Sequence, residues 1–240
     1  DVISLGGLAH GMTRVHKRAE VKRAHPEYYA LGRGKRQTEH QEDGAPCLSS
    51  KELFKLNIKY IRLLYEIYDA PMVSAMPVDG YIRICNCPLC KGKETPGRGS
   101  PGSSLNPAGK HYANGKGSDY VWDYVNRVAK EVYKTHPDRK VLCGAYNIYF
   151  LPPAQIRTLS PNVVVSIVQT GGLHRLPLEQ RERLLRRVRG SYIKRFAEGN
   201  KHLMQGKNTF LNANPGHPYE SLPLFFPHAI SADLLATKGK

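Results

Sequence analysis

The 240-residue chain contains no run of apolar residues long enough to cross a lipid bilayer. It also lacks a glycine-rich loop between a predicted strand and a predicted helix, so the fingerprints of P-loop and dinucleotide-binding proteins are missing. Acidic residues are scarce, because 20 Asp and Glu stand against 36 Lys and Arg, which gives a formal net charge of +16. With 40% hydrophobic residues, the composition predicts a globular protein that does not span a membrane.

The excess of positive charge predicts an attraction to polyanions. The basic residues do not form a single tail but lie in four stretches, residues 14–23, 33–36, 91–98 and 181–195. Aromatic residues are not interleaved with them as in single-strand-binding proteins, and no known nucleic-acid-binding motif is present. Nucleic acid is therefore the less favoured partner. An acidic or sulfated polysaccharide remains a candidate, beside the simpler interpretation that these residues form solvated helix faces.

Five cysteines are too few for a disulfide scaffold in a chain of this length. Cys143 lies in an apolar strand pattern and is expected to be a small buried side chain. The close spacing of Cys85, Cys87 and Cys90 suits a loop around a tetrahedral zinc ion, with Cys47 as the fourth ligand. A disulfide in an exported protein and free thiols are the alternatives. A structural zinc ion is thus one hypothesis, and no cofactor is expected for catalysis.

Predicted strands and helices alternate along the chain. Strands are predicted for residues 2–5, 72–76, 140–149, 163–168 and 208–212, and helices for residues 52–68, 120–133 and 178–199. Ser49 or Ser50 is expected to cap the first of these helices, and Ser118 with Asp119 forms a capping signature before the second. A small hairpin is expected near residues 28–34, and residues 91–117 form a long loop rich in Gly, Pro and Ser. Alternation of this kind predicts a parallel sheet with crossover helices.

This order fits two architectures, a (β/α) barrel and an open doubly wound sheet. Long irregular loops after the strands favour an α/β fold of the TIM-barrel type, formed by residues 1–240 as a single domain. We count about six strand–helix units, fewer than the eight of a closed (β/α)8 barrel. We therefore expect an incomplete barrel that is truncated at both ends, and the absence of an initiator Met at Asp1 suggests an excised or processed piece.

Polar side chains are predicted at the ends of several strands, where α/β enzymes place their chemistry. Asp79 is the candidate catalytic carboxylate, although Pro-Val-Asp-Gly is also a good β-turn sequence. The candidate substrate-binding residues, which can each hydrogen-bond a sugar hydroxyl, are His10, Tyr146, Asn147, Gln169 and His174. His174 and His217 are more simply interpreted as ordinary loop histidines.

A series of motifs along nearly the whole chain resembles the bacterial domain-of-unknown-function 4838 family. The motifs are His25-Pro26-Glu27-Tyr28-Tyr29, Pro77-Val78-Asp79-Gly80 with the Cys-x-Cys-x-x-Cys loop, Ser118-Asp119-Tyr120-Val121-Trp122, Tyr133-Lys134-Thr135-His136-Pro137 and Pro227-His228-Ala229-Ile230.

The resemblance implies similarity to TIM-barrel glycoside hydrolases of the α-glucuronidase and β-hexosaminidase type. Such proteins are exported, which implies an extracellular or periplasmic location and a polysaccharide or oligosaccharide substrate. In these enzymes an acid follows the fourth strand, and Asp79 is the residue that fits. A non-catalytic carbohydrate-binding barrel is the alternative, because no convincing second carboxylate is found at another strand end.

Overall fold

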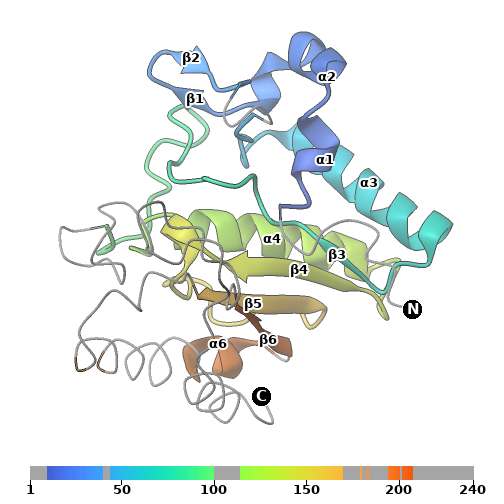
Figure 1. Ribbon diagram of the computed structural model, residues 1–240, viewed down its shortest axis with the longest axis vertical. Helices are drawn as coiled ribbons and strands as arrows, with labels where there is room; N and C mark the ends of the chain where they lie inside the picture. The colour runs from blue at the N-terminus through green and yellow to red at the C-terminus, as the bar shows by residue number, and fades with distance from the viewer. Residues whose placement is uncertain are drawn as a thin grey trace, which may run out of the picture.

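The core of the protein is a parallel sheet with helices packed on one face (Figure 1). Its four strands follow the order β3-β4-β5-β6 and are β3 (Met72–Ser74), β4 (Lys140–Ala145), β5 (Val163–Gln169) and β6 (His202–Lys207). This computed structural model describes residues 10–39, 44–99, 114–169, 179, 183, 194–200 and 202–207.

Three helices lie side by side against the sheet: α3 (Lys51–Tyr68), α4 (Ser118–Tyr133) and α6 (Lys194–Gly199). The rings of Phe54 and Tyr124 join α3 to α4 with centroids 5.8 Å apart, and those of Trp122 and Phe196 join α4 to α6 at 5.1 Å. Among the described strands the order follows the sequence without a reversal, and four strands of this order are compatible with a segment of a barrel and with one half of a doubly wound sheet. The strands described here do not close a barrel, so the predicted (β/α)8 fold stays a prediction.

Both faces of β4 are buried. In β4, Val141, Cys143 and Ala145 belong to the main core, and Leu142, which must point to the opposite face, is only 1% exposed. Burial on both faces explains the continuous apolar character that identified this segment in the sequence.

The N-terminal part forms a separate lobe above the sheet in Figure 1. It contains α1 (Thr13–His16), α2 (Ala19–Ala24), the 3₁₀ turn η1 (Pro26–Tyr28) and a hairpin of β1 (Leu31–Gly32) and β2 (Lys35–Arg36). The predicted hairpin is therefore confirmed. The buried Tyr29 holds the lobe together, since its hydroxyl donates to the carbonyl of His16 and its backbone bridges to Pro46.

The predicted start of the first long helix is confirmed, and that of the second is wrong. Ser50 caps α3 by accepting a hydrogen bond from the amide of Leu53 at 3.3 Å. The predicted cap of α4 was Ser118 with Asp119, but its N-cap is Gly117, which makes no side-chain cap. A Cβ on Gly117 would lie 2.6 Å from the side chain of Ile148, so a larger residue there would require Ile148 to move, and the Ser118 hydroxyl donates to the carbonyl of Leu151 instead of capping the helix.

Two further strand predictions need correction. The strand predicted for residues 140–149 ends at Ala145, and η3 (Asn147–Tyr149) follows it because Asn147 turns the chain with a φ of 45°. Strand β6 was not predicted at all, since its sequence HLMQGK lacks an apolar or alternating pattern.

Several predictions fall on parts of the chain that are not described. The predicted strands at residues 2–5 and 208–212 lie outside the described residues, and so does most of the predicted helix 178–199. Within the predicted loop 91–117, residues 91–99 and 114–117 are described and contain neither helix nor strand. No helix in the described part of the chain is long and apolar enough to cross a membrane.

Candidate functional site

Three of the predicted site residues meet beyond the carboxyl ends of β3 and β4. The carboxylate oxygen Oδ1 of Asp79 accepts a hydrogen bond from the Tyr146 hydroxyl at 3.2 Å and lies 3.6 Å from Nε2 of His10. The amide of Gly80 donates to the same oxygen at 2.8 Å. All contacts of Asp79 with described residues are therefore made through Oδ1.

His10 is held in place by its own backbone and by the extension of β3. Its Nδ1 lies 2.6 Å from the carbonyl oxygen of Pro77, and the next residue but one, Met12, donates its amide to Met76. Because a carbonyl only accepts, Nδ1 carries a proton and Nε2 is the nitrogen that faces Asp79. Gly11 makes this approach possible, since a Cβ there would lie 2.0 Å from the carbonyl oxygen of Ser74.

Asn147 follows Tyr146 directly and is strained in two ways. It has a φ of 45°, and its side chain is only 3% exposed while neither amide atom has a hydrogen-bond partner among the described residues. An unpaired buried amide costs roughly 1–3 kcal/mol. His10 has a φ of 54°, so two of the candidate residues adopt the left-handed conformation that non-glycine residues rarely adopt.

The cluster opens to solvent. The side chain of Asp79 is 58% exposed and that of His10 is 25% exposed. The described cluster therefore leaves room for a ligand to approach the carboxylate, whose Oδ2 is not used in any contact with described residues.

The other predicted substrate-binding residues are not placed in this cluster. Gln169 is the last residue of β5 and its backbone pairs with that of Lys207, but the structure describes only the backbone of this residue. His174 and His217 lie outside the described residues.

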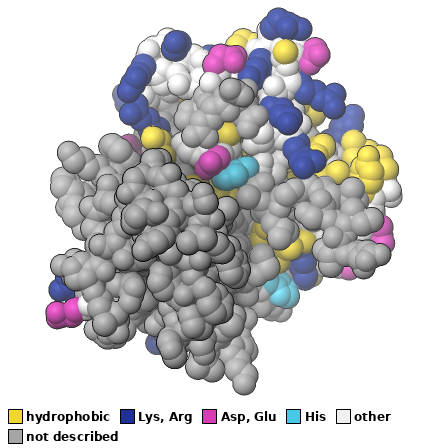
Figure 2. Space-filling model, viewed as in Figure 1, with side chains coloured by type: hydrophobic (Ala, Val, Ile, Leu, Met, Phe, Trp, Pro, Cys, Tyr) yellow, Lys and Arg dark blue, Asp and Glu magenta, His cyan; other side chains and the backbone are white. Residues whose placement is uncertain are grey.

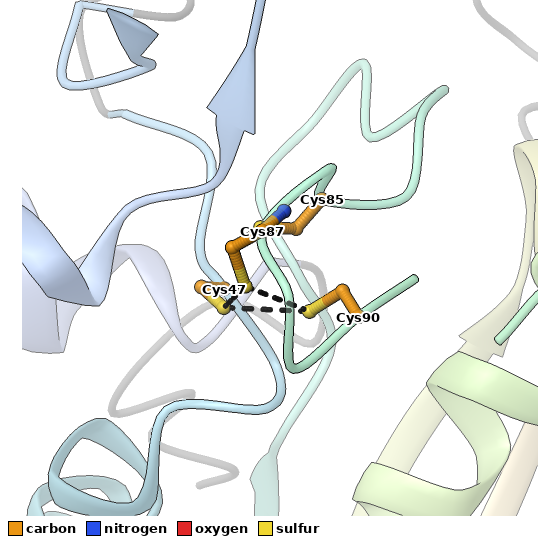
Figure 3. Close-up of side chains that lie close together, drawn as sticks. All are labelled: Cys47, Cys85, Cys87 and Cys90. Carbon is orange, nitrogen blue, oxygen red and sulfur yellow. Dashed lines mark hydrogen bonds between the residues drawn. The ribbon is translucent and has the colours of Figure 1, made fainter. Parts of the chain in front are cut away.

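The four predicted metal ligands do come together. The Sγ atoms of Cys47, Cys85, Cys87 and Cys90 all lie within 4.8 Å of one another, and each cysteine is at most 4% exposed. Figure 3 shows Cys47 on the segment before α3 and the other three on the loop after β3, with the sulfur atoms of Cys47, Cys87 and Cys90 turned toward one another. All four are free thiols, so none of the pairs forms a disulfide. A cluster of four thiols is a donor set that zinc accepts, and these residues could hold a metal ion.

Hydrogen bonds within the cluster shift the pKa values of its thiols in opposite directions. Hydrogen bonds with Cys85 and Cys90, together with burial, raise the pKa of Cys47, whereas hydrogen bonds from Cys47 and Cys85 lower the pKa of Cys90. By contrast, burial alone raises the pKa of the separate thiol Cys143.

Sequence reasoning missed the neighbours of the cysteine cluster. The hydroxyl of Tyr120, at the start of α4, lies 3.1 Å from Sγ of Cys90, and the amide of Leu31 in the hairpin donates to Sγ of Cys85 at 3.2 Å. The buried Tyr81 donates its hydroxyl to the carbonyl of Pro46, next to Cys47. No local signal marks these residues, because each contact depends on the packing of distant segments.

Residues 4–198 match the model of a protein family described as a domain of unknown function, DUF4838, and the chain belongs to this family. No curated protein and no solved structure matches the chain.

Proposed function

We propose that this member of the DUF4838 family is a carbohydrate-active enzyme domain that hydrolyses glycosidic bonds, with Asp79 as the general acid. The observation that supports the proposal most directly is the meeting of His10, Asp79 and Tyr146 beyond the ends of parallel strands. In barrel enzymes, catalytic residues come from the ends of several strands and converge at one face.

The chemistry of the cluster suits a ligand rich in hydroxyl groups. A carboxylate accepts hydrogen bonds from sugar hydroxyls, whereas a phenol and a neutral imidazole can both donate to them and accept from them. The contacts of Asp79 through Oδ1 fix the orientation of the carboxyl group, so that Oδ2 can face a bound sugar. The unpaired amide of Asn147, directly after Tyr146, is a further group that a ligand or a nearby segment could satisfy.

Asp79 would protonate the oxygen of the leaving sugar. A bound glycan would cover this exposed side chain and remove water from it, and loss of water favours the neutral, proton-donating form of a carboxyl group. His10 and Tyr146 would keep the group oriented through the reaction.

A non-catalytic glycan-binding role is the second candidate. Most glycosidases use two carboxyl groups on either side of the scissile bond. The described residues of this site, namely His10, Asp79, Tyr146 and Asn147, include only one. A hydrolase would need its second carboxylate, or assistance from the substrate, beyond these residues.

The charge of the protein favours an acidic substrate. Exposed basic residues are numerous in the N-terminal lobe, where Figure 2 shows Lys and Arg side chains spread over the surface. Uronic or sulfated glycans would be attracted to such a surface, and this attraction would weaken with added salt. A nucleic acid would be attracted by the same charge, but nothing in the cluster of His10, Asp79 and Tyr146 favours it.

The decisive experiment measures hydrolysis and binding separately, on a panel of neutral and acidic oligosaccharides. Asp79→Asn keeps the size of the side chain but removes its acid, so we expect turnover to fall about 10²- to 10⁴-fold while binding persists. Asp123→Asn is the matched control, because Asp123 is a similarly exposed carboxylate on α4 that pairs with Arg127.

Three results would count against parts of the proposal. Binding without turnover in the wild-type protein would support the non-catalytic role. Equal turnover in the two variants would exclude Asp79 as the acid. Equal binding of neutral and acidic glycans, with no effect of salt, would remove the acidic substrate.

A further inference from the structure

We infer that Cys47, Cys85, Cys87 and Cys90 bind a single structural zinc ion that fastens the N-terminal lobe to the sheet domain. This inference does not depend on the proposed function, because the cluster is separate from the cluster around Asp79. It starts from two segments that are distant in sequence, the turn before α3 and the loop after β3, which bring these four sulfur atoms together (Figure 3).

Three of the six S···S separations match those of a tetrahedral zinc site, and the sulfur atom of Cys85 lies within 4.8 Å of the other three. A Zn–S bond of about 2.3 Å implies S···S edges of about 3.8 Å in a tetrahedron. The Sγ atom of Cys47 lies 3.8 Å from that of Cys87 and 3.6 Å from that of Cys90, and the last two are 3.5 Å apart. Sulfur atoms joined as a disulfide would be about 2.05 Å apart, so the arrangement is that of ligands around a common centre.

The loop has the local structure of a metal-binding knuckle. The amides of Cys90 and Lys91 both donate to the carbonyl of Cys87, at 2.9 and 3.1 Å, which closes a tight turn and brings two sulfur atoms to one side. Gly92 follows this turn and has a φ of 76°. Glycine is the residue best suited to this conformation.

Backbone amides and a tyrosine hydroxyl are placed to stabilise negatively charged sulfur. The amides of Leu31 and Cys87 donate to Sγ of Cys85, at 3.2 and 3.4 Å, and the Tyr120 hydroxyl lies 3.1 Å from Sγ of Cys90. Thiolates bound to zinc carry negative charge, and such outer contacts orient the ligands and compensate the charge. Four neutral thiols in a core would not need them.

The site is closed, which assigns it to structure and not to catalysis. A catalytic zinc ion keeps a coordination position open for water or substrate. Here four cysteines supply all the ligands of a tetrahedron, and none is more than 4% exposed.

The ion would connect three parts of the protein. Cys47 belongs to the segment that pairs with the hairpin lobe through Pro46, the other ligands belong to the loop after β3, and Tyr120 belongs to α4. Tyr81 adds a second link, because its buried hydroxyl donates to the carbonyl of Pro46 at 3.1 Å. Since Asp79 lies two residues before Tyr81, the same tether restrains the loop that carries the carboxylate.

The direct test is metal analysis of the full chain, purified under reducing conditions without added metal. We expect about one zinc ion per chain, released by a thiol-modifying reagent, as for a four-cysteine structural site. After removal of the zinc, Co²⁺ should rebind and show the intense absorption of tetrahedral thiolate coordination. Iron in place of zinc, or a chain that takes up neither zinc nor cobalt, would overturn the inference.

Variants assign the ligands. Cys47→Ala and Cys90→Ala should each lose the bound zinc, while Cys143→Ala, which removes a buried thiol elsewhere, should keep it. The ligand variants could lose zinc simply by unfolding. Mapping the reactive thiols of the folded wild-type protein is therefore a second, independent test. Zinc-protected thiols that become reactive together on chelation support the site, and a disulfide among the four would refute it.

Discussion

The loop after β3 carries two clusters that are built in opposite ways. The cysteine cluster is buried and its members satisfy one another, with Sγ atoms 3.5 to 3.8 Å apart across three of its pairs. The cluster of His10, Asp79 and Tyr146 lies at the other end of the loop, where the carboxylate is 58% exposed. One cluster is complete within the chain, whereas the other leaves one carboxylate oxygen free of contacts with described residues.

The difference indicates which cluster serves stability and which serves a ligand. Buried polar groups that are fully satisfied make a structure rigid, and removing one member leaves the others unpaired. Polar groups at an open surface contribute little to stability but can contact a ligand. Substitutions should therefore affect stability in the first cluster and activity in the second.

The largest expected effect is the loss of a zinc ligand. Cys90→Ala should lower the free energy of unfolding by about 3–5 kcal/mol or more, because structural zinc contributes directly to folding free energy. Thermal unfolding with and without a chelator measures the change. Cys143→Ala is the control and should cost only about 1–2 kcal/mol through a small cavity. A Cys90→Ala protein as stable as the control would contradict a metal-binding role.

Gly11→Ala should disrupt the open cluster without touching the cysteines. The added Cβ would lie 2.0 Å from the carbonyl oxygen of Ser74, so the segment must move and carry His10 with it. We expect a loss of about 1–3 kcal/mol in stability from overpacking and at least a tenfold loss of glycan binding, with zinc content unchanged. Gly32→Ala is the control, because its added Cβ meets only the flexible side chain of Gln37, at 3.3 Å. This variant should keep the stability and the glycan binding of the wild-type protein.

Asn147→Gly should separate function from stability. Glycine adopts a φ of 45° without strain and removes an unpaired buried amide, while its greater freedom in the unfolded chain offsets part of the gain. We expect stability within about 1 kcal/mol of wild type, together with weaker glycan binding. Calorimetry and binding measured on the same sample would test this. A clear loss of stability with unchanged binding would mean that Asn147 serves the fold alone.

The last expected effect is confined to stability at alkaline pH and leaves both clusters unchanged at neutral pH. Burial raises the pKa of Tyr29 from 10.0 to about 12, so between these values the native state keeps a proton that the unfolded state has released. Stability should therefore be fully present below pH 10 and fall as the pH rises toward 12, by at most about 1.4 kcal/mol per pH unit from this group. Urea unfolding across this pH range should show that the free energy of unfolding falls less steeply with pH in Tyr29→Phe than in the wild-type protein. Equal slopes for the two proteins would exclude a contribution from Tyr29.

Local patterns predicted much of the fold. The helix α3 follows from its apolar spacing and from Ser50, whose hydroxyl caps it as expected. The position of Asp79 just after a buried strand also follows from sequence. The early end of β4 could not be predicted, because the turn at Asn147 depends on a φ of 45° that no pattern in the neighbouring sequence marks. Strand β6 is recognisable only by its pairing with β5.

The sequence by itself determined the alternation of strands and helices, the spacing of three cysteines and the presence of a carboxylate after a strand, because these depend on neighbouring residues. Only the tertiary structure brought Cys47 to the other cysteines, 40 residues from Cys87, and placed His10 beside Pro77, 67 residues away. Such contacts depend on how the lobe packs on the sheet. Packing is set by the fit of many distant side chains at once, and no short stretch of sequence encodes it.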